Sequence, residues 1–143
     1  MTPTLMGRWQ TRIAMLGTFG VLISLVFALT WPAGTDFTEE FFYVLGYVAL
    51  FGLAWDVLWI IIQSFRWDRD WPPAFQWVTA GIEGLAVYLL IDNFAIPGIP
   101  EGAVPKDIFA AHYGLVFFVT WAWTQGPMRA MYPRWRFTGG RIL

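Results

Sequence analysis

Four long apolar segments constrain this chain more than any other feature of its sequence. They cover residues 13–31, 41–65, 73–91 and 108–126. About 20 helical residues cross the hydrocarbon core of a membrane, which is about 30 Å thick. Lipid offers no hydrogen-bond partner to the backbone, so a spanning segment must satisfy its own N–H and C=O groups, as an α-helix does. We therefore predict an all-α membrane bundle of four transmembrane helices, followed by a basic, aromatic tail over residues 127–143.

The composition agrees with this class. Only 13% of the residues are charged and 57% are hydrophobic, whereas about a quarter of the residues in a soluble domain are charged. The ten tryptophans are typical of membrane interfaces, where indole rings lie at the headgroup level. The chain has no cysteine, which excludes disulfides and thiolate metal sites. We expect a bacterial cytoplasmic membrane, or an internal membrane derived from one, and no nucleic-acid partner.

The basic residues predict which ends of the helices face the cytoplasm. If the N-terminus is cytoplasmic, that side collects all eight arginines, and the opposite side carries only Lys106. Loops rich in arginine and lysine face the cytoplasm. We therefore expect both termini inside, with the loop between the second and third segments on the same side.

Two carboxylates interrupt the apolar segments. Asp56 lies nine residues before Phe65, about 13 Å from the end of its helix. Glu83 lies at a similar distance into the next segment, and a short connection makes the two helices antiparallel neighbours. Asp56 and Glu83 are therefore expected at one depth near the middle of the membrane, where they can face each other.

An ionised side chain at that depth costs about 2.5–3.5 kcal/mol on insertion scales. We expect no lysine or arginine of this chain at that level, although Arg12, at the inner edge of its segment, can extend partway toward it. The two acids then share a proton, bond to a polar network, or meet a cation of a partner subunit. By helical spacing Gln63 lies on the face of Asp56, and Gln76 and Thr79 lie on the face of Glu83. One functional hypothesis is accordingly a small proton- or ion-coupled carrier or channel that uses Asp56 and Glu83.

Another hypothesis is a pigment- or isoprenoid-binding membrane protein. His112 is the only histidine, and one axial ligand is enough for a pigment. The segment FTEEFF, residues 37–42, resembles the acidic-aromatic motif of the heterodimeric membrane carotenoid cyclases. That resemblance implies that Glu39 and Glu40 would protonate a polyene. Alternatively, these glutamates begin a helix, whose positive dipole end favours them, and His112 is a hydrogen-bonded structural residue.

We favour a non-catalytic accessory or scaffold subunit of a larger membrane assembly. The sequence contains no pattern typical of a catalytic or metal site, and it requires no cofactor, although a bound pigment or lipid fits. Tryptophan and arginine are common in binding hot spots, and both are frequent in the two segments expected at the cytoplasmic surface. We expect these side chains to contact lipids or other membrane subunits: Arg66, Trp67, Arg69, Trp71, Arg134, Trp135 and Arg136.

Overall fold

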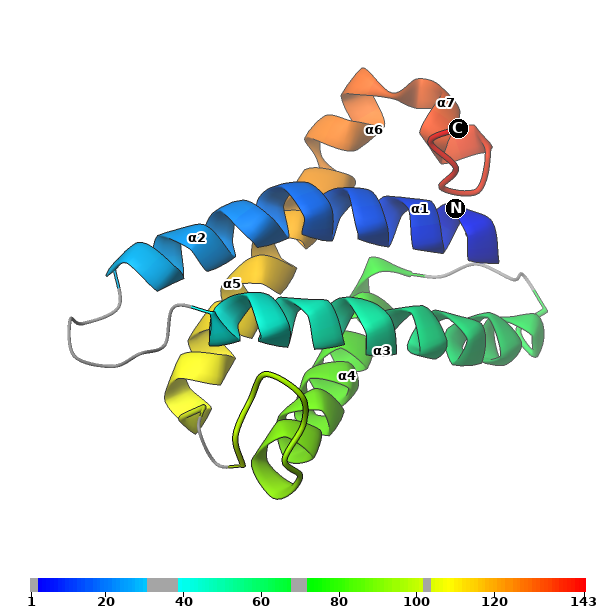
Figure 1. The fold of residues 1–143 in the computed structure, drawn as a ribbon. Helices are drawn as coiled ribbons and strands as arrows, with labels where there is room; N and C mark the ends of the chain where they lie inside the picture. The colour runs from blue at the N-terminus through cyan, green and yellow to red at the C-terminus, as the bar shows by residue number, and fades with distance from the viewer. Residues whose placement is uncertain (1–2, 31–38, 68–71, 102–103) are drawn as a thin grey trace.

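The computed structural model describes residues 3–30, 39–67, 72–101 and 104–143 (Figure 1). The all-α prediction is confirmed, because the described residues form helices and turns, with a single isolated bridge between Ile96 and Ile99 in place of any strand. The expected docking residues Arg69 and Trp71 lie outside the described part of the chain.

The first helix is longer than the sequence predicts. It runs without a break through α1 (Leu5–Met15), the π-helical segment η1 (Leu16–Gly20) and α2 (Val21–Thr30). Thr4 caps its start, where Oγ1 accepts a hydrogen bond from the N–H of Gly7 at 3.1 Å. The predicted start at residue 13 is therefore eight residues late, because an apolar window leaves out the polar first turns of a helix.

Three further long helices follow: α3 (Glu40–Ser64), α4 (Pro73–Asn93) and α5 (Lys106–Gln125). Among the described residues, the helices at 5–30, 40–64 and 73–93 are both long and apolar enough to cross a membrane. The 20 residues of α5 give it a length of about 30 Å, but its histidine, glutamine, threonines and tryptophans make it less apolar.

Burial in these helices differs from that in a soluble protein, because polar side chains lie inside beside the hydrophobic core. Ser24, Asp56, Glu83 and His112 are buried, whereas many large apolar side chains point outward, with Leu29 74% exposed. Polar groups that face the inside of a bundle and apolar groups that face outward are what a lipid environment requires. The fold is thus compatible with a membrane helical protein.

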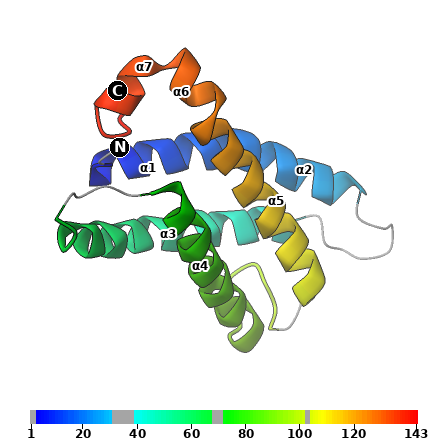
Figure 2. The same ribbon diagram turned by 180° about the vertical axis from the view of Figure 1, so that it is seen from behind.

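The long helices form two crossing pairs. The first helix lies beside α3, and α4 lies beside α5, which crosses the first helix at η1 (Figures 1 and 2). After α5, the short helices α6 (Pro127–Met131) and α7 (Pro133–Phe137) fold back over α1 and bring the two termini together (Figure 1). The return of the chain uses Gly139 and Gly140, whose positive φ angles of 67° and 89° suit glycine.

Candidate functional site

Arg12 joins the two buried carboxylates in one cluster. Its Nε and Nη2 donate to Oδ2 and Oδ1 of Asp56, both at 2.9 Å. Its Nη1 donates to Oε2 of Glu83 at 3.1 Å, and Nη2 also reaches Oε1 at 3.4 Å. We call Arg12, Asp56 and Glu83 the ion cluster. It links α1, α3 and α4, and the expectation that Asp56 and Glu83 lie together agrees with this geometry.

The expectation that no arginine of this chain lies at the level of these acids is wrong, because Arg12 bonds to both of them and does not extend only partway. The first helix begins at Leu5, so Arg12 lies two turns inside a helix rather than at its edge. Gly52 makes room for it on α3, one turn before Asp56, because a Cβ at this position would overlap the guanidinium. The neutralising cation therefore comes from the same chain, and no partner subunit is needed to supply it.

Further side chains complete the hydrogen bonding of the cluster. Trp59 Nε1 donates to Oε1 of Glu83 at 2.7 Å. One turn earlier along α1, Arg8 Nη2 donates to Oε1 of the buried Gln63 at 3.2 Å. Each of the four carboxylate oxygens of Asp56 and Glu83 therefore accepts at least one hydrogen bond from within the chain. Buried charges that are paired and hydrogen-bonded in this way hold helices in register.

A cavity of about 230 Å³ lies against the ion cluster, between α1, α4 and α5. Its lining follows helical spacing on each helix, with Arg8 and Arg12 from α1 and Gln76, Thr79 and Glu83 from α4. Gln125 Nε2 of α5 donates to Gln76 Oε1 at 3.2 Å, and Thr79 donates to the carbonyl of Gln76 at 3.1 Å. The predicted polar residues of α4 thus line the cavity together with Glu83, whereas Gln63 bonds to Arg8 instead.

The C-terminal tail lines one end of this cavity. Trp135 is buried, and its Nε1 donates to Thr11 Oγ1 at 2.8 Å, while the Thr11 hydroxyl donates to the carbonyl of Gly140 at 2.8 Å. Gly7 permits the contact, since a Cβ there would overlap the carbonyl of Gly139. The expectation that Trp135 contacts a partner or lipid is therefore wrong, because its ring packs inside the chain.

The other expected docking residues differ in exposure. Trp67, three residues after the end of α3, is 96% exposed. Arg134 and Arg136 are exposed on α7, and Arg66 lies with its guanidinium carbon 5.2 Å from the centre of the Phe75 ring. Of the residues expected at a docking surface and described here, Trp67, Arg134 and Arg136 are thus the most accessible.

His112 lies in a separate buried site near the other end of the bundle. Its Nε2 is 2.8 Å from Ser24 Oγ, and its ring packs 5.2 Å from those of Phe27 and Phe41. Glu40 begins α3, and Glu39 is its N-cap residue. The structure thus brings the first turn of α3 close to His112 through Phe41, but the imidazole already contacts a serine of its own chain.

Sequence reasoning missed Arg12 and Trp59 as partners of the acids and Gln125 as the partner of Gln76. The available signals were the N-cap residue Thr4, which extends the helix to include both N-terminal arginines, and a glycine one turn before Asp56.

Among the described residues, no group of three or more histidine, cysteine, aspartate or glutamate side chains is arranged to hold a metal ion. No protein-family model matches this chain, and no curated protein or solved structure is significantly similar to it.

Proposed function

We propose that this protein is a non-catalytic accessory or scaffold subunit of a membrane assembly. It would cross a bacterial cytoplasmic membrane, or a membrane derived from one, four times with both termini inside. The observation that carries the proposal is the contrast between a polar interior bonded to itself and exposed aromatic side chains at one end of the molecule.

The four-span topology rests on length and on charge. α5 is as long as α4 to within one residue, with 20 residues against 21. The N–H of Thr4 bonds to the carbonyl of Gly139 at 2.9 Å, so the two termini lie at the same end, as an even number of crossings requires. That end carries the arginines, which favours a cytoplasmic location.

This topology can be tested by cysteine labelling, because the chain has no native cysteine. We expect a cysteine at Glu101 to react with a membrane-impermeant maleimide added to right-side-out vesicles. A cysteine at Arg136 should react only after the membrane is permeabilised. Both positions are exposed. Labelling of both from the same side would show that α5 does not span, and would refute four crossings.

The hydrogen bonds and ion pairs inside the bundle support a structural role for Asp56 and Glu83. Arg12 and Trp59 engage the carboxylate oxygens of both residues. This arrangement ties three helices together without an external ligand. A rigid bundle of this kind can hold its outer side chains in fixed positions for a partner.

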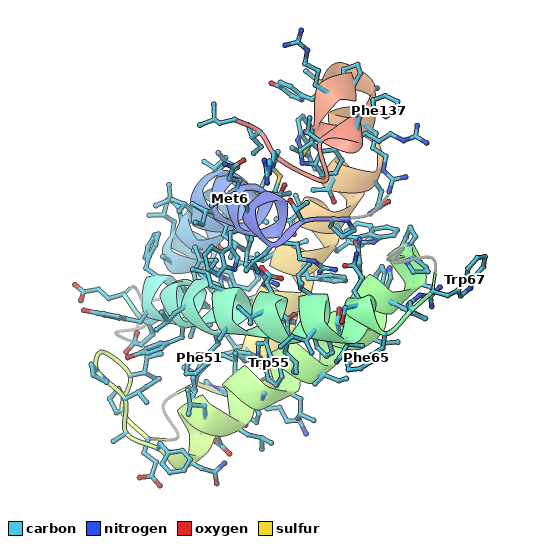
Figure 3. All side chains as sticks on the ribbon, turned by 90° about the vertical axis from the view of Figure 1, so that its right-hand side faces the viewer. Met6, Phe51, Trp55, Phe65, Trp67 and Phe137 are labelled. Atoms are coloured by element: carbon cyan, nitrogen blue, oxygen red, sulfur yellow. The ribbon has the colours of Figure 1, made fainter. Side chains whose placement is uncertain are left out.

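The exposed aromatic residues at the connection between α3 and α4 are the best-supported contact surface. Phe65 and Trp67 are 84% and 96% exposed, and Figure 3 shows Trp67 projecting beyond the end of α3. Large aromatic side chains at a membrane surface contact either lipid headgroups or another protein. We infer a second membrane protein as the partner, since Arg66 adds a cationic side chain of the type common in binding hot spots.

The decisive experiment is site-specific crosslinking in native membranes. A photoreactive phenylalanine analogue at position 67 should yield one discrete protein adduct, which mass spectrometry identifies. The matched control is the same analogue at position 94, where Phe94 is 61% exposed at the opposite end of α4. Lipid adducts alone at position 67, or identical adducts at both positions, would refute the scaffold role.

A proton- or ion-coupled carrier is the second candidate, and the cavity is the observation that favours it. The cavity reaches Asp56 and Glu83 from the end that holds the chain termini. In proteoliposomes such a carrier should show a pH-dependent flux that Asp56→Asn abolishes and that the exposed-site variant Arg136→Gln leaves unchanged. Absence of any flux in the wild-type protein would exclude it.

A further inference from the structure

Residues 127–141, which include α6 and α7, form a C-terminal cap beside the start of the first helix (Figures 1 and 3). Hydrogen bonds hold the cap in place. The N–H of Thr4 donates to the carbonyl of Gly139 at 2.9 Å, and Nε1 of the buried Trp135 donates to Thr11 Oγ1 at 2.8 Å. The cap is thus a fixed part of the fold, with one side against the first helix and the other side open.

The length of the first helix indicates the depth of the cap in a membrane. This helix has 26 residues, from Leu5 to Thr30, which corresponds to about 39 Å. The hydrocarbon core is about 30 Å thick, and the headgroups extend the bilayer to about 40–45 Å. The polar turns of the helix lie at its start, with Arg8, Gln10 and Thr11. When the helix spans the membrane, these turns and the cap that contacts them therefore lie at the level of the headgroups.

The exposed surface of the cap is basic. Arg134, Arg136 and Arg141 are all exposed on it. Residues 127–143 contain no aspartate or glutamate, and no ion pair of these three arginines is found in the part of the chain that the structure describes. The Thr138 hydroxyl donates to the carbonyls of Arg134 and Arg141 at 2.9 and 3.1 Å, which keeps this segment compact. The surface therefore complements an anionic partner.

Exposed apolar side chains accompany these arginines. Phe137 is 82% exposed, and Figure 3 shows it on α7, on the far side of α1 from α3. The guanidinium carbon of Arg136 lies 6.0 Å from the centre of the Phe137 ring, so the charge and the ring share one surface. Met131 and Tyr132 are 62% and 54% exposed. Basic residues beside exposed aromatic side chains are typical of elements that lie in the membrane interface, whereas a contact with an acidic protein segment would require only the charge.

We propose that the C-terminal cap binds anionic phospholipids of the cytoplasmic leaflet. Arg134, Arg136 and Arg141 bind the headgroup phosphates, whose geometry suits a guanidinium, and the Phe137 ring inserts beside them. Interfacial contacts of this kind fix the depth and tilt of a helical bundle. The inference rests on the membrane topology proposed above, but not on the scaffold role, because Trp67 belongs to a different surface.

Native mass spectrometry of purified, delipidated protein in a mild detergent measures this lipid preference. Phosphatidylglycerol is compared with phosphatidylcholine of identical acyl chains, so that only the headgroup differs. A basic residue near an anionic surface contributes about a fivefold change in binding. We therefore expect phosphatidylglycerol to bind at least about fivefold more tightly than phosphatidylcholine.

Two variants assign the preference to the cap. The combined variant Arg134→Gln, Arg136→Gln and Arg141→Gln should lose the preference for phosphatidylglycerol. Lys106→Gln removes an exposed positive charge at the start of α5, far from the cap, and should keep the preference of the wild-type protein.

A fluorescent label tests the contact in vesicles. The chain has no cysteine, so Phe137→Cys can carry a single polarity-sensitive fluorophore. Its emission should lie further to the blue in vesicles that contain phosphatidylglycerol than in pure phosphatidylcholine, and high salt should reduce the difference by screening. The same label at Phe94→Cys, where the native side chain is 61% exposed at the opposite end of α4, should not distinguish the two lipids.

The proposal is overturned if the wild-type protein does not prefer phosphatidylglycerol, if the combined variant keeps the preference, or if both labels respond equally. Binding of polyglutamate without a preference for phosphatidylglycerol would also overturn it, in favour of an acidic protein segment. The wild-type comparison remains decisive even if the combined variant does not fold. Topology and the scaffold role are read separately, from cysteine labelling and from crosslinking at position 67, so their failure is distinguishable from a failure of lipid binding.

Discussion

The substitution Arg12→Met tests the ion cluster most directly. Methionine keeps most of the length and the apolar stem of arginine but removes its charge and its donors. Arg12 makes four hydrogen bonds to Asp56 and Glu83. In the variant these carboxylates stay buried, with side chains 3% and 9% exposed, and lose the guanidinium that forms an ion pair with each of them.

Breaking a buried ion pair by removal of one partner costs about 3–5 kcal/mol. Here one guanidinium serves two carboxylates, so we expect a loss at the upper end of this range, about 5 kcal/mol. The Arg12 side chain is 20% exposed, which allows some solvent screening, but both acids are more deeply buried. A loss of this size is comparable to the whole stability of many small domains.

The sign of the effect should reverse when the acids are neutral. In the double variant Asp56→Asn and Glu83→Gln, Arg12 becomes a buried cation without a counter-ion. Arg12→Met on that background should therefore be neutral or stabilising. Such a reversal is specific to charge compensation, because a loss of packing alone would cost the same on both backgrounds.

The assay is equilibrium unfolding in mixed micelles of a mild detergent and dodecyl sulfate, followed by tryptophan fluorescence. Arg136→Met is the control and should change the free energy of unfolding by less than about 0.5 kcal/mol, as at other exposed sites. A loss below about 1 kcal/mol for Arg12→Met, or an equal loss on both backgrounds, would show that the cluster does not hold the helices together.

Two further substitutions test the close contacts around the site by the same assay. Gly52→Ala places a methyl group in the space of the guanidinium and should cost about 1–3 kcal/mol by overpacking; Gly46→Ala, on the same helix with open space, should be neutral or slightly stabilising. Equal effects at the two glycines would contradict the contact. Trp135→Phe removes the hydrogen bond to Thr11 and should cost about 1 kcal/mol, whereas Trp67→Phe at an exposed position should cost nothing measurable. An unchanged stability for Trp135→Phe would show that the tail is not held by this bond.

The apolar segments were enough to predict three of the four long helices of this protein closely. The starts and ends of α3, α4 and α5 lie within two residues of the prediction. Length and hydropathy determine such elements locally, because each helix satisfies its own backbone. The common depth of Asp56 and Glu83 follows from the same reasoning, since a short connection places their helices side by side.

The partner of these acids was decided only by the tertiary structure. A hydropathy window ends where arginines begin, so it places Arg12 at the edge of the first helix. In the fold, Thr4 caps the helix further upstream, and the absence of a side chain at Gly52 leaves space for the guanidinium. Gly52 and Asp56 lie far from Arg12 in the sequence, and hydropathy carries no information about which helix faces meet.

The orientation of the tail was likewise beyond the sequence. It contains one tryptophan, Trp135, between Arg134 and Arg136, a pattern typical both of an exposed anchor and of a folded cap. Only the contact of Gly139 with Gly7, and the bond from Trp135 to Thr11, turn the tryptophan inward. The sequence by itself determined the helices and the depth of their polar residues, because these depend on local hydropathy. The tertiary structure decided which side chains pair and what encloses the cavity, because both depend on contacts between segments far apart in the chain.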